Sequence, residues 1–258
     1  MVNQMNFKKP HFIADKTELA IHSLNELKNK YVSFPISEAD VIVIIGGDGF
    51  MLDNLKAYQD LELPFYGINQ GTIGFLMNQN QDEILMKKLN EAEVTIIHPL
   101  KMQAKKIDGG IEEHLAINEI SILRTGSQAA KLKVVVDDFV RLQELVCDGA
   151  LVSTPAGSTA YNYSAHGPIL PIDSNILALT AMAAFRPRRW RGALIPSRAK
   201  IEFLNTEPKK RQVSAFADSK EVENIISVKI LCEYNVSYKL LFDLGHGLQE
   251  RILREQFF

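Results

Sequence analysis

The chain has 258 residues, a formal net charge of −2 and 46% hydrophobic residues. This length allows one large domain or two smaller ones, with a core that needs neither a disulfide nor a metal. The nearly balanced charge argues against nucleic acid or an anionic membrane as the main partner. Cys147 and Cys232 lie far apart and no signal peptide is visible, so we expect free thiols, no structural zinc and a cytoplasmic protein.

The first 98 residues are predicted to form an α/β domain. Short apolar runs alternate there with segments that carry apolar residues at helical spacing. Strands that alternate with helices imply a parallel sheet. The expected strands are 12–14, 41–45 and 65–69, and the expected helices are 17–30, 50–58 and 81–89.

A glycine-rich turn with one carboxylate follows the second of these strands. Five consecutive β-branched residues, Val41–Ile45, predict a strand buried on both faces, and Gly46-Gly47-Asp48-Gly49 comes directly after it. We expect the glycines to adopt positive φ and to bring backbone N–H groups close to a ligand. Asp48 is the reactive side chain of the turn, which suggests phosphate chemistry in which the carboxylate handles a proton or a metal. The alternative is a tight turn in which Asp48 caps the next helix.

A second glycine-bearing loop, Asn69–Leu76, follows the third strand. Because the carboxyl ends of parallel strands meet at one edge of a sheet, we expect this loop on the same edge as the Gly46–Gly49 turn. The alternative is a plain connection in which Gly71 and Gly74 serve only as turn residues.

From about His98 the pattern becomes β-rich and mainly antiparallel, and Pro99 marks the change. Lysine alternates with apolar residues over 131–136, and Asp137-Asp138 predicts a hairpin turn before Phe139-Val140. Further strands are expected at 200–204, 212–216, 225–231 and 236–242, and a short helix at 248–258.

Two polar segments of this half are candidates for ligand binding. Asn118-Glu119 interrupts a strand-like run, and an amide beside a carboxylate can bind a base edge and ribose hydroxyls. The alternative is an outward-facing glutamate and a locally satisfied asparagine. Asp148–Pro168 passes from a strand into a loop of small hydroxyl residues before a helix-like run, which suits an anion or a sugar. The alternative there is a helix cap in a small-residue turn.

Other motifs narrow the chemistry. The basic run Arg186–Arg191 is either a solvated turn or a clamp on nucleotide phosphates. The sequence contains no GxxxxGK[ST] loop and no GxGxxG motif, which excludes a standard P-loop kinase and a Rossmann dehydrogenase.

Together these motifs resemble the NAD kinase family. The resemblance spans nearly half of the chain, and its order and spacing carry it. It implies phosphorylation of the 2′-hydroxyl on the adenosine ribose of NAD by ATP and Mg²⁺, which gives NADP. The matching residues are Gly46–Gly49, Asn69-x-Gly71-x-x-Gly74-Phe75-Leu76, Asn118-Glu119 and Asp148-Gly149 through Tyr161 to Ser164 and Gly167-Pro168.

The resemblance also implies roles for individual residues. Asp48 is then the general base, and Gly46, Gly47 and Gly71 bind phosphate. No residue is assigned as a metal ligand. The residues expected to bind substrate are Gly49, Phe75, Asn118, Glu119, Asp148, Ser158, Thr159, Ala160, Tyr161, Asn162, Ser164, Ala183 and Asp218.

The family's organisation implies a homodimer or homotetramer of two-domain chains. Residues 1–98 would form the nucleotide-binding domain and 99–242 the β-rich NAD-binding domain, with 243–258 packing back on the first. Phe50, where the family frequently has threonine, and the Arg186–Arg191 run leave the donor open among ATP, another nucleoside triphosphate and polyphosphate. Two other interpretations are a lipid kinase of the diacylglycerol type, which shares the glycine motif, and an NAD(P)-binding regulator without turnover.

Overall fold

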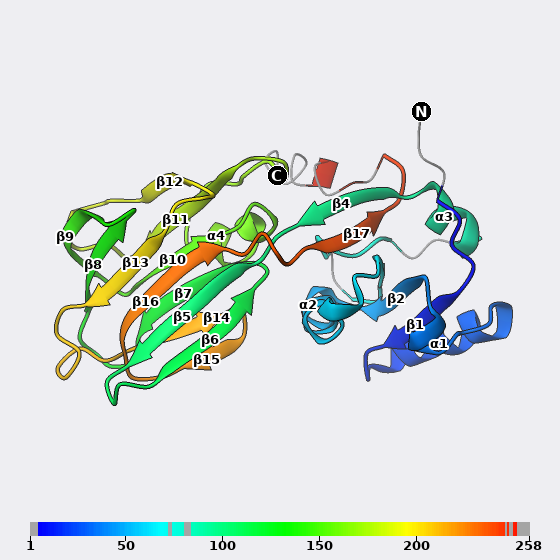
Figure 1. Cartoon of the computed structure of the whole chain (residues 1–258), viewed down its shortest axis with the longest axis horizontal. Coiled ribbons are helices and arrows are strands. Elements are labelled where there is room, and N and C mark those ends of the chain that lie inside the picture. Colours follow the sequence, from blue (N-terminus) through cyan, green and yellow to red (C-terminus); the bar gives the residue numbers. More distant parts are fainter. Residues whose placement is uncertain (1–4, 72–73, 80–83, 246, 248–249, 252–258) are drawn as a thin grey trace. The chain divides into compact units, whose positions relative to one another are not determined.

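The computed structural model describes residues 5–71, 74–79, 84–245, 247 and 250–251. The chain divides into two compact units (Figure 1). The first unit holds the residues up to Ile97 and those from Val236 onward, and the second unit holds His98–Asn235. The expected combination of an α/β part with a parallel sheet and a β-rich part is confirmed.

The first unit is built on one five-stranded sheet. Its strand order is β1 (Pro10–Ala14), β2 (Val41–Gly46), β3 (Phe65–Asn69), β17 (Tyr238–Phe242) and β4 (Glu93–Ile97). The pairs run parallel except for β4, which pairs antiparallel with β17 at the edge. The helices are α1 (Glu18–Lys30), α2 (Asp48–Ala57) and α3 (Leu85–Glu91), with short 3₁₀ turns at Ile36–Glu38 and Gln59–Leu61. The start of the expected helix 81–89 and most of 248–258 lie outside the described residues.

β2 is buried along its whole length, as its β-branched residues predict. Val41, Val43 and Ile45 pack in one core cluster together with side chains from α1 and α3. On the other face, Met51 of α2 lies so close to Gly67 that a Cβ there would be 2.7 Å from the Met51 Cε. Helices therefore cover both faces of the sheet. The loops that follow β2 and β3 lie at the ends of these strands, beyond the faces that these helices cover.

β17 differs from expectation in the sheet that it joins. The sequence pattern assigns 236–242 to the β-rich part, but Tyr238–Phe242 is inserted between β3 and β4 of the first unit. All its residues except Lys239 are buried, as a strand inside a sheet with both faces covered requires. Its apolar pattern indicates a buried strand equally well in either sheet, so the pattern alone does not choose between them.

The second unit contains two six-stranded sheets in which every pairing is antiparallel. The first has the order β12 (Gly192–Pro196), β11 (Ile176–Met182), β10 (Gly149–Ser153), β7 (Glu119–Arg124), β14 (Val213–Ala217) and β15 (Lys220–Val222). The second has the order β6 (Ile111–Ala116), β5 (Leu100–Lys106), β16 (Ile225–Cys232), β13 (Ile201–Asn205), β8 (Ala130–Val136) and β9 (Phe139–Cys147). A 3₁₀ turn, Ala156–Thr159, and the short helix α4 (Tyr161–Ser164) follow β10.

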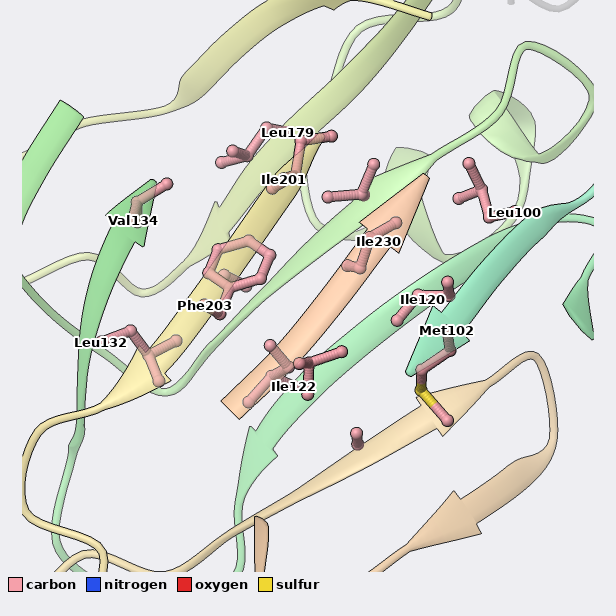
Figure 2. Close-up of a cluster of buried hydrophobic side chains, with 14 of the residues drawn as sticks. Leu100, Met102, Ile120, Ile122, Leu132, Val134, Leu179, Ile201, Phe203 and Ile230 are labelled. Atoms are coloured by element: carbon pink, nitrogen blue, oxygen red, sulfur yellow. The ribbon is translucent and has the colours of Figure 1, made fainter. Parts of the chain in front are cut away.

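The core of this unit is one cluster of apolar side chains drawn from both sheets. Figure 2 shows Ile120 and Ile122 from β7 in the same cluster as Phe203 from β13 and Ile230 from β16. This packing holds β7 and β10 in place, and the polar segments singled out in the sequence lie at the ends of those two strands.

The predicted hairpin between β8 and β9 is confirmed. Asp137 and Asp138 have φ of 51° and 64°, the two left-handed residues that a tight hairpin turn of this kind requires. Within the described ranges, no helix has both the length and the apolar character that crossing a membrane would require.

Candidate functional site

The turn after β2 presents Asp48 as the first residue of α2. Gly47 is the N-cap residue, its backbone is extended, and no side chain in the described part of the chain caps this helix end. The expectation of positive φ at Gly46, Gly47 and Gly49 is wrong, since none of them adopts it. The chain passes directly from extended to helical backbone, so the turn needs no left-handed residue.

Glycine is needed in this turn for space. A Cβ on Gly46 would lie 3.1 Å from Cδ1 of Phe50 and 3.2 Å from Cβ of Asp15, so the turn packs closely there. A Cβ on Gly47 or Gly49 would meet no atom of the described residues within 4 Å. The backbone at the start of α2 is therefore open to a ligand, and a helix N-terminus favours an anion through its N–H groups and its dipole.

The Asp48 carboxylate accepts two hydrogen bonds from the second glycine loop. The N–H of Phe75 donates at 2.7 Å and the N–H of Leu76 at 3.0 Å. A Cβ on Gly74 would lie 2.5 Å from Oδ1 of Asp48, so the carboxylate occupies space that only glycine leaves. The two loops meet at one edge of the sheet, as expected, and the capping alternative for Asp48 is excluded.

Burial raises the pKa of Asp48. The hydrogen bonds from Phe75 and Leu76 and the nearby charge of Arg251 lower that pKa, but the effect of burial is larger. The result is a carboxylate more basic than an exposed aspartate, which is the property that a general base needs.

In the second unit, Asp218 holds the backbone of the turn that carries Asn118. Its carboxylate accepts hydrogen bonds from the N–H groups of Ile117 at 2.8 Å, Asn118 at 2.9 Å and Glu119 at 3.3 Å. The sequence predicts Asp218 as a substrate-binding residue. The structure shows both of its carboxylate oxygens in contact with this turn.

Thr154 and Gly157 hold the same turn. Thr154 Oγ1 donates to the Ile117 carbonyl at 2.8 Å, and its N–H donates to the Asn118 carbonyl at 2.9 Å. A Cβ on Gly157 would lie 2.2 Å from that carbonyl oxygen, so the loop packs directly on the turn. The Asn118 side chain is half-buried, and the hydrogen bonds within the described part of the chain do not involve its amide. This amide is available to a ligand.

The hydroxyl-rich loop contains two kinds of residue. Ser158 and Asn162 are fully buried and bond within the loop: Ser158 Oγ donates to the Pro155 carbonyl at 2.7 Å and Asn162 Nδ2 to the Pro168 carbonyl at 2.9 Å. Tyr161, by contrast, is 40% exposed. Thr159, Ala160 and Ser164 are also at least partly exposed.

Asp148 lies at the opposite end of β10 from the Asn118 turn. In the pairing of β10 with β7, Gly149 is opposite Leu123 and Ser153 is opposite Glu119. Asp148 and Asn118 flank these two pairs, so they lie about 20 Å apart along the strands. The Asp148 carboxylate accepts a hydrogen bond from Arg124 Nε at 2.6 Å.

Tyr161 and Ala183 lie toward this second position. The Tyr161 hydroxyl contacts Met182 Sδ at 3.4 Å, and the N–H of Asp148 donates to the Met182 carbonyl at 3.0 Å. Ala183 follows directly, is exposed and has a φ of 48°. The structure thus groups Tyr161, Asp148 and Ala183, and it places the Asn118 turn apart from Asp148.

Sequence reasoning missed two residues beside the Asp48 loop. Asn78 is fully buried, and its Nδ2 donates to the Leu241 carbonyl at 2.9 Å. Arg251 donates to the carbonyl of Gly74, 177 residues away in the chain. No local pattern signals contacts of this range. Among the residues that the structure describes, no group of three or more His, Cys, Asp or Glu side chains is placed to hold a metal ion.

Two family models match the chain. The ATP-NAD kinase N-terminal domain matches residues 5–93, and the ATP-NAD kinase C-terminal domain matches residues 117–231. The chain belongs to the ATP-NAD kinase family. An NAD kinase from Cereibacter sphaeroides is 54% identical over 246 residues, which are 95% of this chain and 97% of the relative. An NAD kinase from Rickettsia canadensis is 48% identical over 253 residues, which are 98% of this chain and 99% of the relative.

Solved structures of this family share the fold. Yeast NADH kinase in complex with NADH aligns with a TM-score of 0.79 at 17% identity, over 98% of this chain and 88% of that chain. An NAD kinase from Archaeoglobus fulgidus in complex with ATP aligns with a TM-score of 0.73 at 24% identity, over 97% of each chain. The family and the fold class expected from the sequence are therefore confirmed.

Proposed function

We propose that the protein transfers the γ-phosphate of ATP to the 2′-hydroxyl on the adenosine ribose of NAD and so makes NADP. Membership of the ATP-NAD kinase family, with relatives matched over nearly the whole chain, supports this activity. The observation that carries the mechanism is the placement of Asp48, a carboxylate with a raised pKa, held by two N–H groups beside open backbone.

Asp48 is the general base in this mechanism. Phosphoryl transfer depends mainly on positioning and on charge stabilisation. As the 2′-oxygen forms its bond to the γ-phosphorus, the bond from that phosphorus to ADP breaks and the hydroxyl proton passes to Asp48. General-base assistance of this kind contributes about 10²–10⁴ to a rate. The two hydrogen bonds from Phe75 and Leu76 keep the carboxylate from rotating away from the hydroxyl.

The donor phosphates fit the open backbone at the start of α2. Gly46 and Gly47 lie at the end of β2 and at the helix N-cap, and a Cβ on Gly47 or Gly49 would meet no atom within 4 Å among the residues that the structure describes. A Cβ on Gly71 would come no closer than 4.0 Å to another atom, so the second loop also leaves room for a phosphate. We include Mg²⁺ as part of the donor. That ion is commonly bound through substrate phosphates and one or two carboxylates, so it does not require a group of three or more ligating side chains.

NAD is assigned to the second unit's polar segments. The amide of Asn118 suits the adenine edge, and the carboxylate of Glu119 suits ribose hydroxyls. Thr159, Ala160, Tyr161 and Ser164 form the partly exposed rim of the hydroxyl-rich loop. Ser158, Asn162 and Asp218 act by shaping the loops that carry these groups. Phe75, Asp148 and Ala183 complete the proposed set of contacts.

We also propose a homodimer or homotetramer. Phe139, Phe185 and Leu194 are 66%, 57% and 55% exposed, and an interface between two copies of the chain would bury such side chains. Light scattering on the purified protein measures the state directly. A cytoplasmic location, without nucleic acid or membrane partners, stays a prediction.

A coupled assay tests the function. The purified protein is incubated with NAD and Mg²⁺-ATP, and NADP is read with an NADP-specific dehydrogenase. Parallel reactions with polyphosphate as donor and with NADH as acceptor determine the substrate range. We expect NADP with ATP. If neither donor gives NADP while NAD still binds, the protein is a binding protein without turnover and the proposal is wrong.

A further inference from the structure

The guanidinium of Arg251 contacts the loop that holds Asp48. Nη1 of Arg251 donates to the carbonyl of Gly74 at 3.3 Å and to the carbonyl of Phe75 at 3.2 Å. Nη1 also donates to the Met77 carbonyl, so its two N–H bonds are shared among three carbonyls, and Nη2 donates to Asn78 Oδ1 at 3.2 Å. One planar side chain therefore binds four consecutive or nearly consecutive positions of this loop.

Arg251 and Asp48 bind opposite ends of the same two peptide groups. The carbonyl of Gly74 and the N–H of Phe75 belong to one peptide group, and the carbonyl of Phe75 and the N–H of Leu76 belong to the next. Arg251 donates to both carbonyls, and Asp48 accepts from both N–H groups. In a trans peptide these two groups point in opposite directions. Two peptide groups thus lie between a cation and an anion.

This arrangement fixes the direction of the N–H groups toward Asp48. A positive charge at the carbonyl end and a negative charge at the N–H end both favour the same orientation of the peptide dipole, and hydrogen bonds in such a chain strengthen one another. Without the guanidinium, the carbonyls of Gly74 and Phe75 lose their hydrogen-bond donor. The two peptide groups can then rotate, and the carboxylate of Asp48, which is bonded to their N–H groups, can move with them.

Several groups surround Arg251. Burial lowers the pKa of Arg251, and the opposing effect of Asp243, Asp48 and Tyr66, which raise that pKa, is smaller. The guanidinium also lies over the ring of Phe242 at 5.1 Å.

Asp243 and Asn78 join this arrangement to the sheet. Asp243 is paired with Lys88 at 3.1 Å, and its N–H donates to Asn78 Oδ1 at 3.0 Å. The same Asn78 oxygen accepts from Arg251. Arg251 is thus fixed to the end of β17 as well as to the loop.

We propose that Arg251 is a positioning residue for the phosphoryl transfer, which acts by holding the two peptide groups that present their N–H bonds to Asp48. This inference rests on the proposed function, because it assigns Asp48 as the base. Arg251 binds the main chain of the loop, and the proposed NAD contacts other than Phe75 lie in the second unit, so we expect its effect mainly on the chemical step and much less on the binding of NAD.

Three variants test the proposal. Arg251→Met removes the charge and the donors, and Arg251→Lys keeps the charge but loses the planar fork. Arg211→Met is the matched control, because Arg211, in the second unit, also donates to a backbone carbonyl, that of Ala129, and is held by the Glu207 carboxylate. The measurements are kcat and KM for NAD, the pH dependence of kcat, and the melting temperature by circular dichroism.

We expect Arg251→Met to lower kcat by about 10- to 100-fold, because a misplacement of about 1 Å in a reacting group costs up to about that much. KM for NAD should stay within about threefold, since the interaction lost is one that serves the chemical step. Arg251→Lys should recover part of kcat. Arg211→Met should lower the melting temperature and keep the wild-type kcat.

The pH profile separates positioning from general stability. The charge of Arg251 lowers the pKa of Asp48, so the acid limb of kcat should move to higher pH in Arg251→Met and stay in place in Arg251→Lys. The other titratable groups around Arg251 are the same in both variants: Asp243, Tyr66 and Lys88.

Different results would contradict the role of Arg251 and the proposed NAD kinase activity. An Arg251→Met protein that melts lower but keeps kcat, or one that changes only KM for NAD, overturns the inference. If Arg251→Met does not fold, Arg251→Lys decides: a lowered kcat at an unchanged melting temperature supports the inference, and a wild-type kcat overturns it. A wild-type protein that makes no NADP overturns the proposed function instead.

Discussion

Asp48 in the first unit and Asp218 in the second make the same kind of contact and serve different ends. Asp48 accepts hydrogen bonds from the backbone N–H groups of Phe75 and Leu76, and Asp218 accepts them from the N–H groups of the turn Ile117–Glu119. Around Asp48 the backbone is open at Gly47 and Gly49. The turn held by Asp218 is also packed against Thr154 and Gly157.

The difference is in what the contact positions. At Asp48 the loop positions the carboxylate, and at Asp218 the carboxylate positions the loop. A carboxylate that binds backbone N–H groups is therefore neither catalytic nor structural by that contact alone. Its role depends on whether there is space for a ligand next to the carboxylate, and on which polar groups nearby stay available to that ligand. Changes to the first contact should affect kcat, and changes to the second should affect KM for NAD.

The largest effect is expected from Asp48→Asn. Because the amide cannot accept the 2′-hydroxyl proton, kcat should fall by about 10²–10⁴, while NAD binding measured by calorimetry should persist. Asp53→Asn is the matched control, since Asp53 is exposed on the same helix. Normal turnover by Asp48→Asn would remove Asp48 from the role of base.

Gly74→Ala should follow in size. The new methyl group would lie 2.5 Å from Asp48 Oδ1 and must displace the carboxylate, which should lower kcat by up to about 100-fold. Gly126→Ala is the control, because a Cβ at Gly126 meets nothing within 4 Å. Steady-state kinetics on both proteins gives the answer, and equal kcat values would show that the loop tolerates the shift.

Asp218→Asn should affect the second contact, that between Asp218 and the Asn118 turn. An amide offers one acceptor oxygen where the carboxylate offers two, so the Asn118 turn loses part of its support, at a cost of about 1–3 kcal/mol. We expect KM for NAD to rise about tenfold with kcat little changed, the pattern of lost substrate binding. Asp173→Asn, at an exposed position, is the control. A fall in kcat at constant KM would contradict the division of roles.

The smallest effect concerns the pH dependence of kcat in the wild-type protein, in the acid limb, where kcat falls as the pH is lowered. Asp48 must be ionised to accept a proton, and burial raises its pKa. Activity should therefore be lost, as the pH falls, above the pH of about 4 at which an ordinary aspartate titrates. The limb should be unchanged in Asp218→Asn. A limb at or below pH 4 would show that Asp48 titrates as an exposed group.

Local patterns predicted the parts of the fold that depend on neighbouring residues. The β-branched run Val41–Ile45 forms a strand buried on both faces, and Asp137-Asp138 forms the hairpin turn. The two glycine loops were predictable as neighbours because β2 and β3 are adjacent parallel strands. In each case the evidence lies within about ten residues, where backbone geometry and side-chain alternation act directly.

Contacts over long range were not predictable in the same way. Tyr238–Phe242 has the pattern of a buried strand but no signal for the sheet that it joins. Arg251 reads as one more charged residue near a helix end. The glycines of the Gly46–Gly49 turn were expected for their φ, and they serve instead to leave room for Phe50, Asp15 and a ligand. Space of this kind is set by tertiary packing, which one sequence does not display.

The place of β17 has a consequence for the order in which the chain folds during synthesis. β4 pairs with β17, and β17 follows the whole second unit in the chain. At about 5–20 residues per second, the ribosome needs roughly 7–28 s to make the intervening segment. The first unit emerges first but completes its sheet last. All strands of the second unit are synthesised before β17. A ribosome that stalls before residue 238 therefore leaves β4 without its pairing partner.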